Sequence, residues 1–179
     1  MSTAEAQPSQ ASPFWRFSLR FYRRPEVAAA CIALQEEAGV DVNLLLFLLW
    51  HATLEHELLP AEVAALEARV GPWRDAAVIP LRAVRRTLRS PPALVAEATA
   101  EAFRTRIKAV ELEAERLQQE AMHELVRASL LGRKAASTQH AARANVAAYE
   151  TICRVPFPKP AIETLLAALD GLERKTEES

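Results

Sequence analysis

The sequence predicts an all-α protein: a compact multi-helix domain around a central buried helix at about 41–57, with a long helix at about 94–131 and a C-terminal helix on a proline spacer. Composition is the first reason, because Ala, Leu, Glu and Arg dominate and residues that favour strands rarely cluster. Proline positions are the second, because they recur where helices can begin. With 50% apolar residues over 179 positions, one domain can bury its own core.

Two short helices are expected first. Ser12-Pro13 reads as an N-cap followed by proline at the first helical position, which predicts an aromatic helix over 14–22. Pro25 repeats this arrangement and predicts a helix over 26–38 that ends at a glycine.

The central helix carries the longest apolar run of the chain. Asp41 is a plausible N-cap, and Leu44–Trp50 are seven consecutive apolar residues, so this helix is apolar on all sides and should be buried. Asn43 and His51 flank the run. Their polar groups either satisfy backbone groups of neighbouring segments or line a pocket, and the sequence leaves both readings open.

Prolines also divide the next part of the chain. Pro60 predicts a helix that ends before Gly71-Pro72, and residues 73–78 predict one short helical turn. Pro80 predicts a further helix, which ends at Pro91-Pro92.

From residue 94 to residue 131 neither proline nor glycine occurs, which predicts one long helix. Its apolar residues recur at steps of three and four and predict a single buried stripe: Phe103, Ile107, Val110, Ala114, Leu117, Ala121, Leu125 and Ala128. Unbroken, this helix would span about 57 Å, longer than a compact domain is wide. It should therefore kink, project or pair with a partner.

The last part of the chain predicts an alanine-rich helix to about Cys153, the extended spacer VPFPKP and a final amphipathic helix. The predicted division is a disordered N-terminus, a helical domain, a proline-rich spacer, a C-terminal amphipathic helix and a disordered tail: 1–11, 12–153, 154–160, 161–172 and 173–179.

Charge is distributed in blocks behind a formal net charge of −1. Residues 1–25 carry +3, residues 26–70 carry −7, and residues 71–90 carry +4. Helical spacing places several arginines on two faces: Arg16, Arg20 and Arg23 on one helix, and Arg82, Arg85, Arg86 and Arg89 on the other. These faces either fold back on the acidic block between them, which we favour, or form a patch for phosphate, nucleic acid or anionic lipid.

The sequence gives no positive sign of catalysis, and no cofactor or metal is predicted. His51 and His56 are five residues apart and diverge on a helix, so they are poorly spaced as metal ligands. Glu111 and Glu115 lie one helical turn apart, a pattern that mostly marks a solvated helix face. The N-terminus does not resemble a secretory signal, and Cys31 and Cys153 read as thiols in a reducing compartment, so a cytoplasmic location is expected.

Several segments carry a resemblance to a known family. YRRPEVAAACIALQEEAGVDVNLLLFLLWHATL, PLRAVRRTLR at 80–89 and ELEAERLQQ at 111–119 resemble short proteobacterial proteins catalogued as a domain of unknown function, over roughly residues 12–130. GVDVNLLLFLLW is the most specific part. The resemblance implies a recurring helical core and brings no activity, cofactor or site residue.

The preferred function is a non-catalytic interaction or assembly protein that holds a protein partner or a second copy through the long or the C-terminal helix. An enzyme or ligand-binding protein for an anionic or isoprenoid-like molecule is the alternative, with one candidate pocket lined by Asn43, Trp50, His51, Arg82, Arg86, Glu111 and Glu115. The third hypothesis is a nucleic-acid or membrane-surface protein acting through Arg16, Arg20, Arg23, Arg85 and Arg89. A pI near 6.4 speaks against this third reading.

Overall fold

A computed structural model describes residues 11–128 and 131–177, and over these residues the protein is almost entirely helical, which confirms the all-α prediction. The helices are α1 (Pro13–Tyr22), α2 (Pro25–Ala38), α3 (Val42–Ala52), α4 (Pro60–Trp73), η2 (Arg74–Val78), α5 (Ile79–Thr87), α6 (Glu97–Ala128), α7 (Thr138–Cys153) and α8 (Lys159–Glu177). Two short strands, β1 (His56–Glu57) and β2 (Arg133–Lys134), pair antiparallel.

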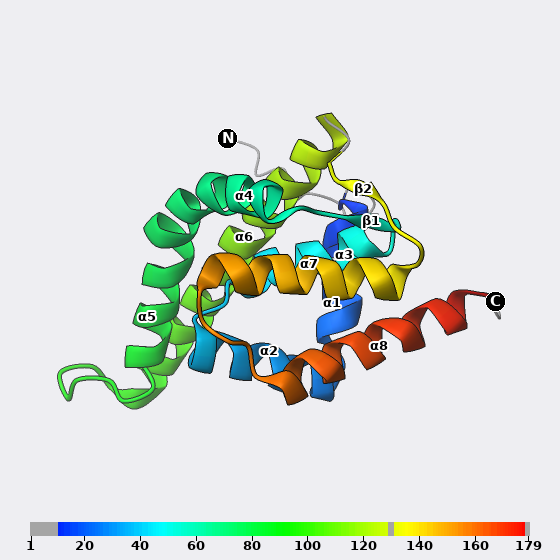
Figure 1. The fold of residues 1–179 in the computed structure, drawn as a ribbon. Helices are drawn as coiled ribbons and strands as arrows, with labels where there is room; N and C mark the ends of the chain where they lie inside the picture. Colours follow the sequence, from blue (N-terminus) through cyan, green and yellow to red (C-terminus); the bar gives the residue numbers. More distant parts are fainter. Residues whose placement is uncertain (1–10, 129–130, 178–179) are drawn as a thin grey trace.

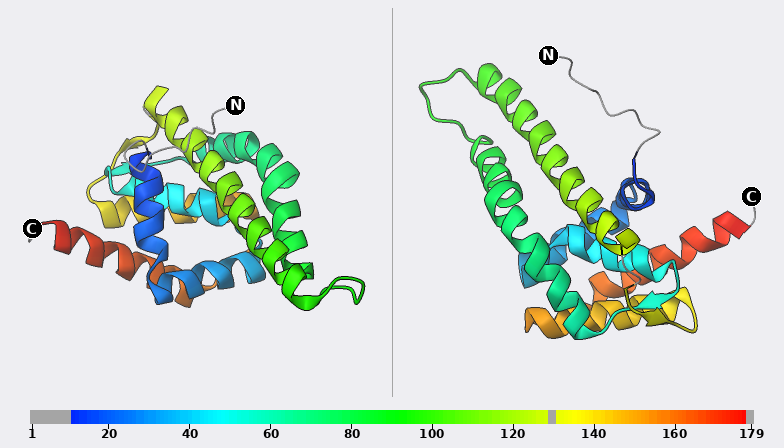
Figure 2. Two further views of the ribbon diagram at one scale, coloured as in Figure 1. Left: turned by 180° about the vertical axis from the view of Figure 1, so that it is seen from behind. Right: turned by 90° about the horizontal axis from the view of Figure 1, so that it is seen from above.

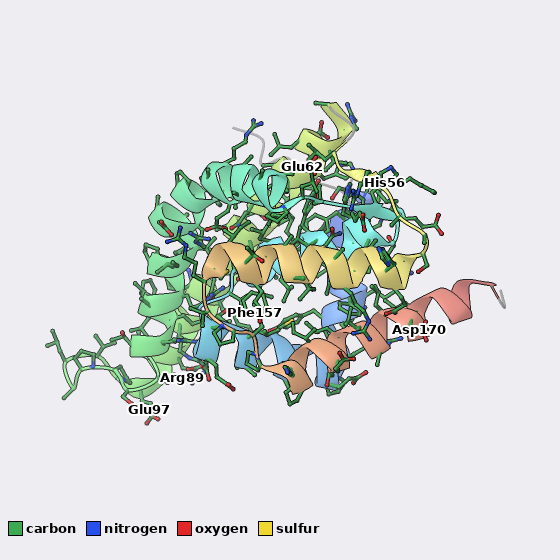
Figure 3. The ribbon with its side chains drawn as sticks, in the orientation of Figure 1. His56, Glu62, Arg89, Glu97, Phe157 and Asp170 are labelled. Atoms are coloured by element: carbon green, nitrogen blue, oxygen red, sulfur yellow. The ribbon has the colours of Figure 1, made fainter. Side chains whose placement is uncertain are left out.

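Helix α3 lies at the centre of the molecule, as the apolar run predicts. All of its residues from Asn43 to Ala52 are buried, and helices α1, α6 and α7 pack around it (Figure 1). Helix α8 packs along α2 below them, where Leu165, Leu166 and Leu169 are buried. The segment between α7 and α8 also contributes to the core, because Phe157 is buried against it (Figure 3).

The central helix is shorter than the predicted 41–57. Asp41 is its N-cap, and its carboxylate accepts the backbone N–H groups of Asn43 and Leu44. The helix ends at Ala52 because the chain turns and Glu55 adopts a left-handed conformation with φ of 56°. The next two residues then form β1 instead of a further helical turn.

The predicted break at Gly71-Pro72 is wrong, because α4, η2 and α5 follow one another as one bent helical rod (Figure 1). The π-helical turn η2 explains how Pro80 can occur within this rod. The backbone N–H of Ile79 donates to the carbonyl of Arg74, five residues earlier, which widens the turn just before Pro80. A regular turn there would bring the proline ring against the carbonyl four residues earlier.

Helices α5 and α6 form a hairpin that extends away from the other helices, as the view from above in Figure 2 shows. Helix α6 is one unbroken helix of 32 residues, about 48 Å long. Arg89 and Glu97 lie near the tip of this hairpin (Figure 3). The predicted end of the long helix near residue 131 involves residues 129–130, which lie outside the described residues.

The C-terminal helix is longer than predicted. It covers Lys159–Glu177 instead of 161–172, so the helix continues into residues 173–177 of the predicted tail. These residues have good helix propensity and contain no proline or glycine, so nothing in them ends the helix. The other predicted disordered segment, residues 1–11, lies outside the described residues except for residue 11, as do residues 178–179 of the tail.

Candidate functional site

Arginines of α5 meet glutamates of α6 where the hairpin joins the body. The Arg82 guanidinium donates to Glu111 (3.2 Å), to Glu115 (2.8 Å) and to the side-chain carbonyl of Gln35 on α2 (2.8 Å). Arg85 donates to both carboxylate oxygens of Glu111, one of them at 3.1 Å. Four of the charged residues singled out in the sequence therefore form one cluster.

Burial and pairing act in opposite directions on the two glutamates. Burial by itself would raise the pKa of Glu111, but the hydrogen bonds from Arg85 and Arg82 outweigh it and lower that pKa. Burial raises the pKa of Glu115, and the single contact with Arg82 does not reverse this. Both guanidinium groups point at carboxylates of their own chain, so this cluster serves to hold the hairpin together.

A second polar network adjoins this cluster at the N-terminus of α3. Gln118 donates to the Asp41 carboxylate (2.8 Å), and Gln119 donates to the side-chain carbonyl of Asn43 (2.7 Å). The Tyr149 hydroxyl accepts the backbone N–H of Asp41 (3.0 Å). Asn43 thus has a structural partner, in line with the first of the two readings of the sequence.

Trp50 and His51 lie at the opposite end of α3. The His51 ring nitrogen Nε2 is 3.1 Å from the carbonyl oxygen of Leu131, and burial lowers the pKa of this histidine. Trp50 packs between the rings of Phe14 and His123, with centroids 5.4 Å and 5.5 Å away. Both residues are part of the packed core.

The seven residues proposed as one pocket are therefore divided among separate places. Arg82, Glu111 and Glu115 share the cluster, and Asn43 lies in the network next to it. Trp50 and His51 lie at the far end of α3, and the half-exposed Arg86 lies 3.6 Å from Glu36. The prediction of a single pocket is wrong. Asn43 is separated from Trp50 and His51 by seven to eight residues of helix, about 11 Å.

The two predicted arginine faces also lie apart. Arg16 and Arg20 on α1 and Arg23 directly after it are exposed, whereas α5 lies on the other side of the molecule (Figure 2). Arg16 and Arg20 border an open hollow of about 730 Å³, together with Trp50 and Leu172. Arg85 is paired with Glu111, and Arg89 is exposed near the hairpin tip (Figure 3).

The α5 arginines fold back, as we favoured, but mainly onto another acidic segment than the one predicted. Their carboxylate partners at close range are Glu111 and Glu115 of the long helix. From the acidic block at 26–70, Gln35 accepts a hydrogen bond from Arg82, and Glu36 lies at the longer distance of 3.6 Å from Arg86.

The face that the long helix buries overlaps only in part with the stripe that its apolar pattern predicts. Ala114 of that stripe is buried and Leu125 packs against the core. The buried residues of the helix are Ala100, Glu111, Ala114, Gln118, Gln119 and Met122. Phe103, Val110 and Leu117 are instead 47%, 51% and 44% exposed. The reason is that Asp41 and Asn43 of the body and Arg82 and Arg85 of α5 all face this helix, and these groups need polar partners.

Residues of α4 and α5 extend this exposed apolar surface of α6. Trp73 is 42% exposed and its indole N–H donates to the backbone carbonyl of Ala114, so it lies along the same side of α6. Near the tip, Leu88 and Phe103 line one apolar hollow of about 540 Å³. We call the following set the hairpin face: Trp73, Val84, Leu88, Phe103, Val110 and Leu117.

A sequence signal for this arrangement exists. Glu111 and Gln118 are seven residues apart and flank Ala114, which places two polar side chains and one small one on a common helix face. Such a face suits packing against other polar groups. Only the identity of those groups, which come from distant segments, is missing from the sequence.

No group of three or more His, Cys, Asp or Glu side chains in the part of the chain that the structure describes could hold a metal ion. Within the same residues, none of the helices combines the length and the hydropathy needed to cross a membrane.

Comparison with known proteins places the chain in a family. Residues 13–122 match the family described as "Protein of unknown function (DUF2390)", and this segment runs from α1 through most of α6. Neither a curated protein nor a solved structure matches the chain. Because the match covers more than half of the sequence, the chain belongs to the DUF2390 family.

Proposed function

We propose that this protein is a non-catalytic interaction protein that holds a helical protein partner on the hairpin face. The observation that carries the proposal is the exposure of Phe103, Val110 and Leu117, which are seven residues apart on one helix and each about half exposed. Single exposed apolar residues are ordinary on protein surfaces, but a repeat of seven on one side of a helix is the pattern of a helix that packs against another helix.

The neighbouring residues support this proposal. Trp73 and Val84 extend the apolar surface across to the bent rod formed by α4, η2 and α5, so a partner helix could rest in the groove between two helices. The hairpin itself is fixed by Arg82 and Arg85 on Glu111, which makes the face a preformed surface.

The two other functions considered from the sequence have weaker support. A ligand pocket would need its polar groups to converge on one cavity, but Arg82 and Arg85 are directed at carboxylates of the same chain. A phosphate-binding surface would have to rely on the exposed arginines near α1 and on Arg89, because Arg82 and Arg85 are already paired. A cytoplasmic location is part of the proposal, and the free thiols of Cys31 and Cys153 fit a reducing compartment.

Site-specific photo-crosslinking in cells that make the full chain tests the proposal. A photoreactive phenylalanine analogue replaces Val110 in one variant and Leu112 in the other. Both positions are about half exposed on α6, at 51% and 49%, but helical spacing places them on opposite sides. We expect covalent protein adducts from position 110 only. Equal adduct yields at the two positions, or none at either, would contradict the proposal.

A further inference from the structure

We infer that the partner on the hairpin face is a second copy of this chain, with the two α6 helices antiparallel and the Val110 residues facing each other at a twofold axis. This inference rests on the proposed function and makes it more specific, because it names the occupant of the face. It is carried by the spacing of the apolar residues and by the charges beside them.

The apolar spacing is symmetric about Val110. Phe103 precedes it by seven residues and Leu117 follows it by seven. When two such helices lie antiparallel, Phe103 of one copy meets Leu117 of the second copy, and the two valines meet each other. All three exposed apolar positions then gain an apolar partner.

The charges beside these residues are complementary under the same symmetry. Arg106 and Glu113 both lie next to the apolar residues on α6, seven residues apart, and the midpoint between them falls beside Val110. In an antiparallel pair, equivalent flanking positions of this kind face each other. Arg106 of each copy therefore lies next to Glu113 of the other, which gives two equivalent ion pairs.

Neither flanking residue is committed to the core. Arg106 lines the apolar hollow near the tip, and among the residues that the structure describes no carboxylate forms an ion pair with it. Glu113 is 53% exposed, and its ion-pair partner within the described residues is Arg116, three residues further along the same helix. Exposed ion pairs of this kind contribute little to stability, so both Arg106 and Glu113 can turn towards a second copy.

The parallel arrangement lacks this complementarity. In a parallel pair, the position of Arg106 faces the position five residues further along the second helix, which is Glu111. The Glu111 side chain is only 7% exposed, because Arg82 and Arg85 enclose it. The antiparallel arrangement alone gives Arg106 an accessible carboxylate.

The available surface is wide enough for such a dimer. Stable interfaces bury roughly 800 Å² on each partner, more than three residues of one helix can supply. Trp73 and Val84 lie exposed on the neighbouring rod, and Leu88 borders the hollow at the tip, so the contact can broaden from helix on helix to hairpin on hairpin.

Charge exchange measured by sedimentation equilibrium on the full chain tests the inference. Arg106→Glu and Glu113→Arg each turn two attractive contacts into two repulsive ones, so each variant alone should weaken self-association about tenfold. An equimolar mixture of the two variants should recover the wild-type affinity, because every facing pair is again opposite in charge. Lys108→Glu, on the other side of α6, is the matched control and should leave association unchanged.

Cysteine crosslinking tests the orientation in a Cys153→Ala background. Phe103→Cys and Leu117→Cys chains should form a disulfide with each other when mixed, and neither should do so alone. Disulfide formation within a single variant would overturn the antiparallel arrangement. A wild-type chain that stays monomeric at about 100 µM would overturn self-association altogether. If position 110 then formed adducts with a different protein, the proposed function would still hold. If it formed adducts neither with a different protein nor with a second copy, both the proposed function and the inference would be wrong.

Discussion

At the scale of single residues, the most informative feature is a glutamate that is buried and still charged. The Glu111 side chain is 7% exposed and bound by two arginines, and its pKa lies below the ordinary value of 4.5. We expect Glu111→Gln to lower the free energy of unfolding at pH 7 by about 1–3 kcal/mol, since hydrogen bonds between charged groups are lost. Urea unfolding of both proteins measures this difference.

The pH dependence of that difference follows from the direction of the pKa shift. A folded-state pKa below 4.5 means that Glu111 stabilises the fold fully above pH 4.5, and that this stabilisation is lost as the pH falls through the folded-state value. The difference in unfolding free energy between the wild type and Glu111→Gln should therefore shrink as the pH falls below 4.5. A difference that stays constant from pH 7 down to the pH of acid unfolding would contradict the assignment.

Glu115→Gln is the matched control, because its pKa is shifted in the opposite direction. Burial raises the pKa of Glu115, so its contribution is present below pH 4.5 and is lost as the pH rises through the folded-state value. At pH 7 the ionisation of Glu115 therefore adds no stability to the fold, and Glu115→Gln should lower the free energy of unfolding less than Glu111→Gln does.

At the scale of the elements, two glycines with left-handed backbone differ in what surrounds them. Gly39 ends α2 with φ of 66° and open space around it, whereas a Cβ on Gly132, with φ of 80°, would lie 2.5 Å from the backbone oxygen of Glu57. We expect Gly39→Ala to cost about 1–2 kcal/mol through backbone strain alone. Gly132→Ala should cost at least twice as much, because it also forces β1 away from the segment before β2. Equal losses of thermal stability would contradict this.

The same scale shows what the sequence could predict. Local signals were sufficient for the all-α fold and for the Asp41 cap, and the pairing of Arg82 with Glu111 joins residues that the sequence had already proposed to lie together. The apolar periodicity of α6 could not predict which face of the helix is buried. Asp41 and Asn43, which come from a distant segment, need polar partners, and Gln118 and Gln119 are therefore buried against them. The π-helical turn was not predicted either, because Gly71-Pro72 has the local sequence of a helix end.

At the scale of the whole molecule, the folding unit is larger than the segment that matches the family. The match ends at residue 122, yet α7 lies directly on the central helix. Asn145 of α7 is fully buried, and its side chain binds the carbonyls of Leu48 and His56 and the N–H of Leu58. The body that supports the hairpin therefore depends on the C-terminal third of the chain.

Removal of α8 should consequently unfold the body and not merely shorten the protein. Leu165, Leu166 and Leu169 are at most 2% exposed, and each contributes about 1.5–3 kcal/mol by burial. Their sum approaches the typical total stability of a domain, about 5–15 kcal/mol. We expect a chain ending at residue 158 to lack a cooperative unfolding transition in urea, followed by circular dichroism. Ala167→Ser, at an exposed position of the same helix, should leave the transition unchanged. A shortened chain that unfolds at the wild-type midpoint would show instead that α1 to α7 form a self-sufficient core to which α8 only adds.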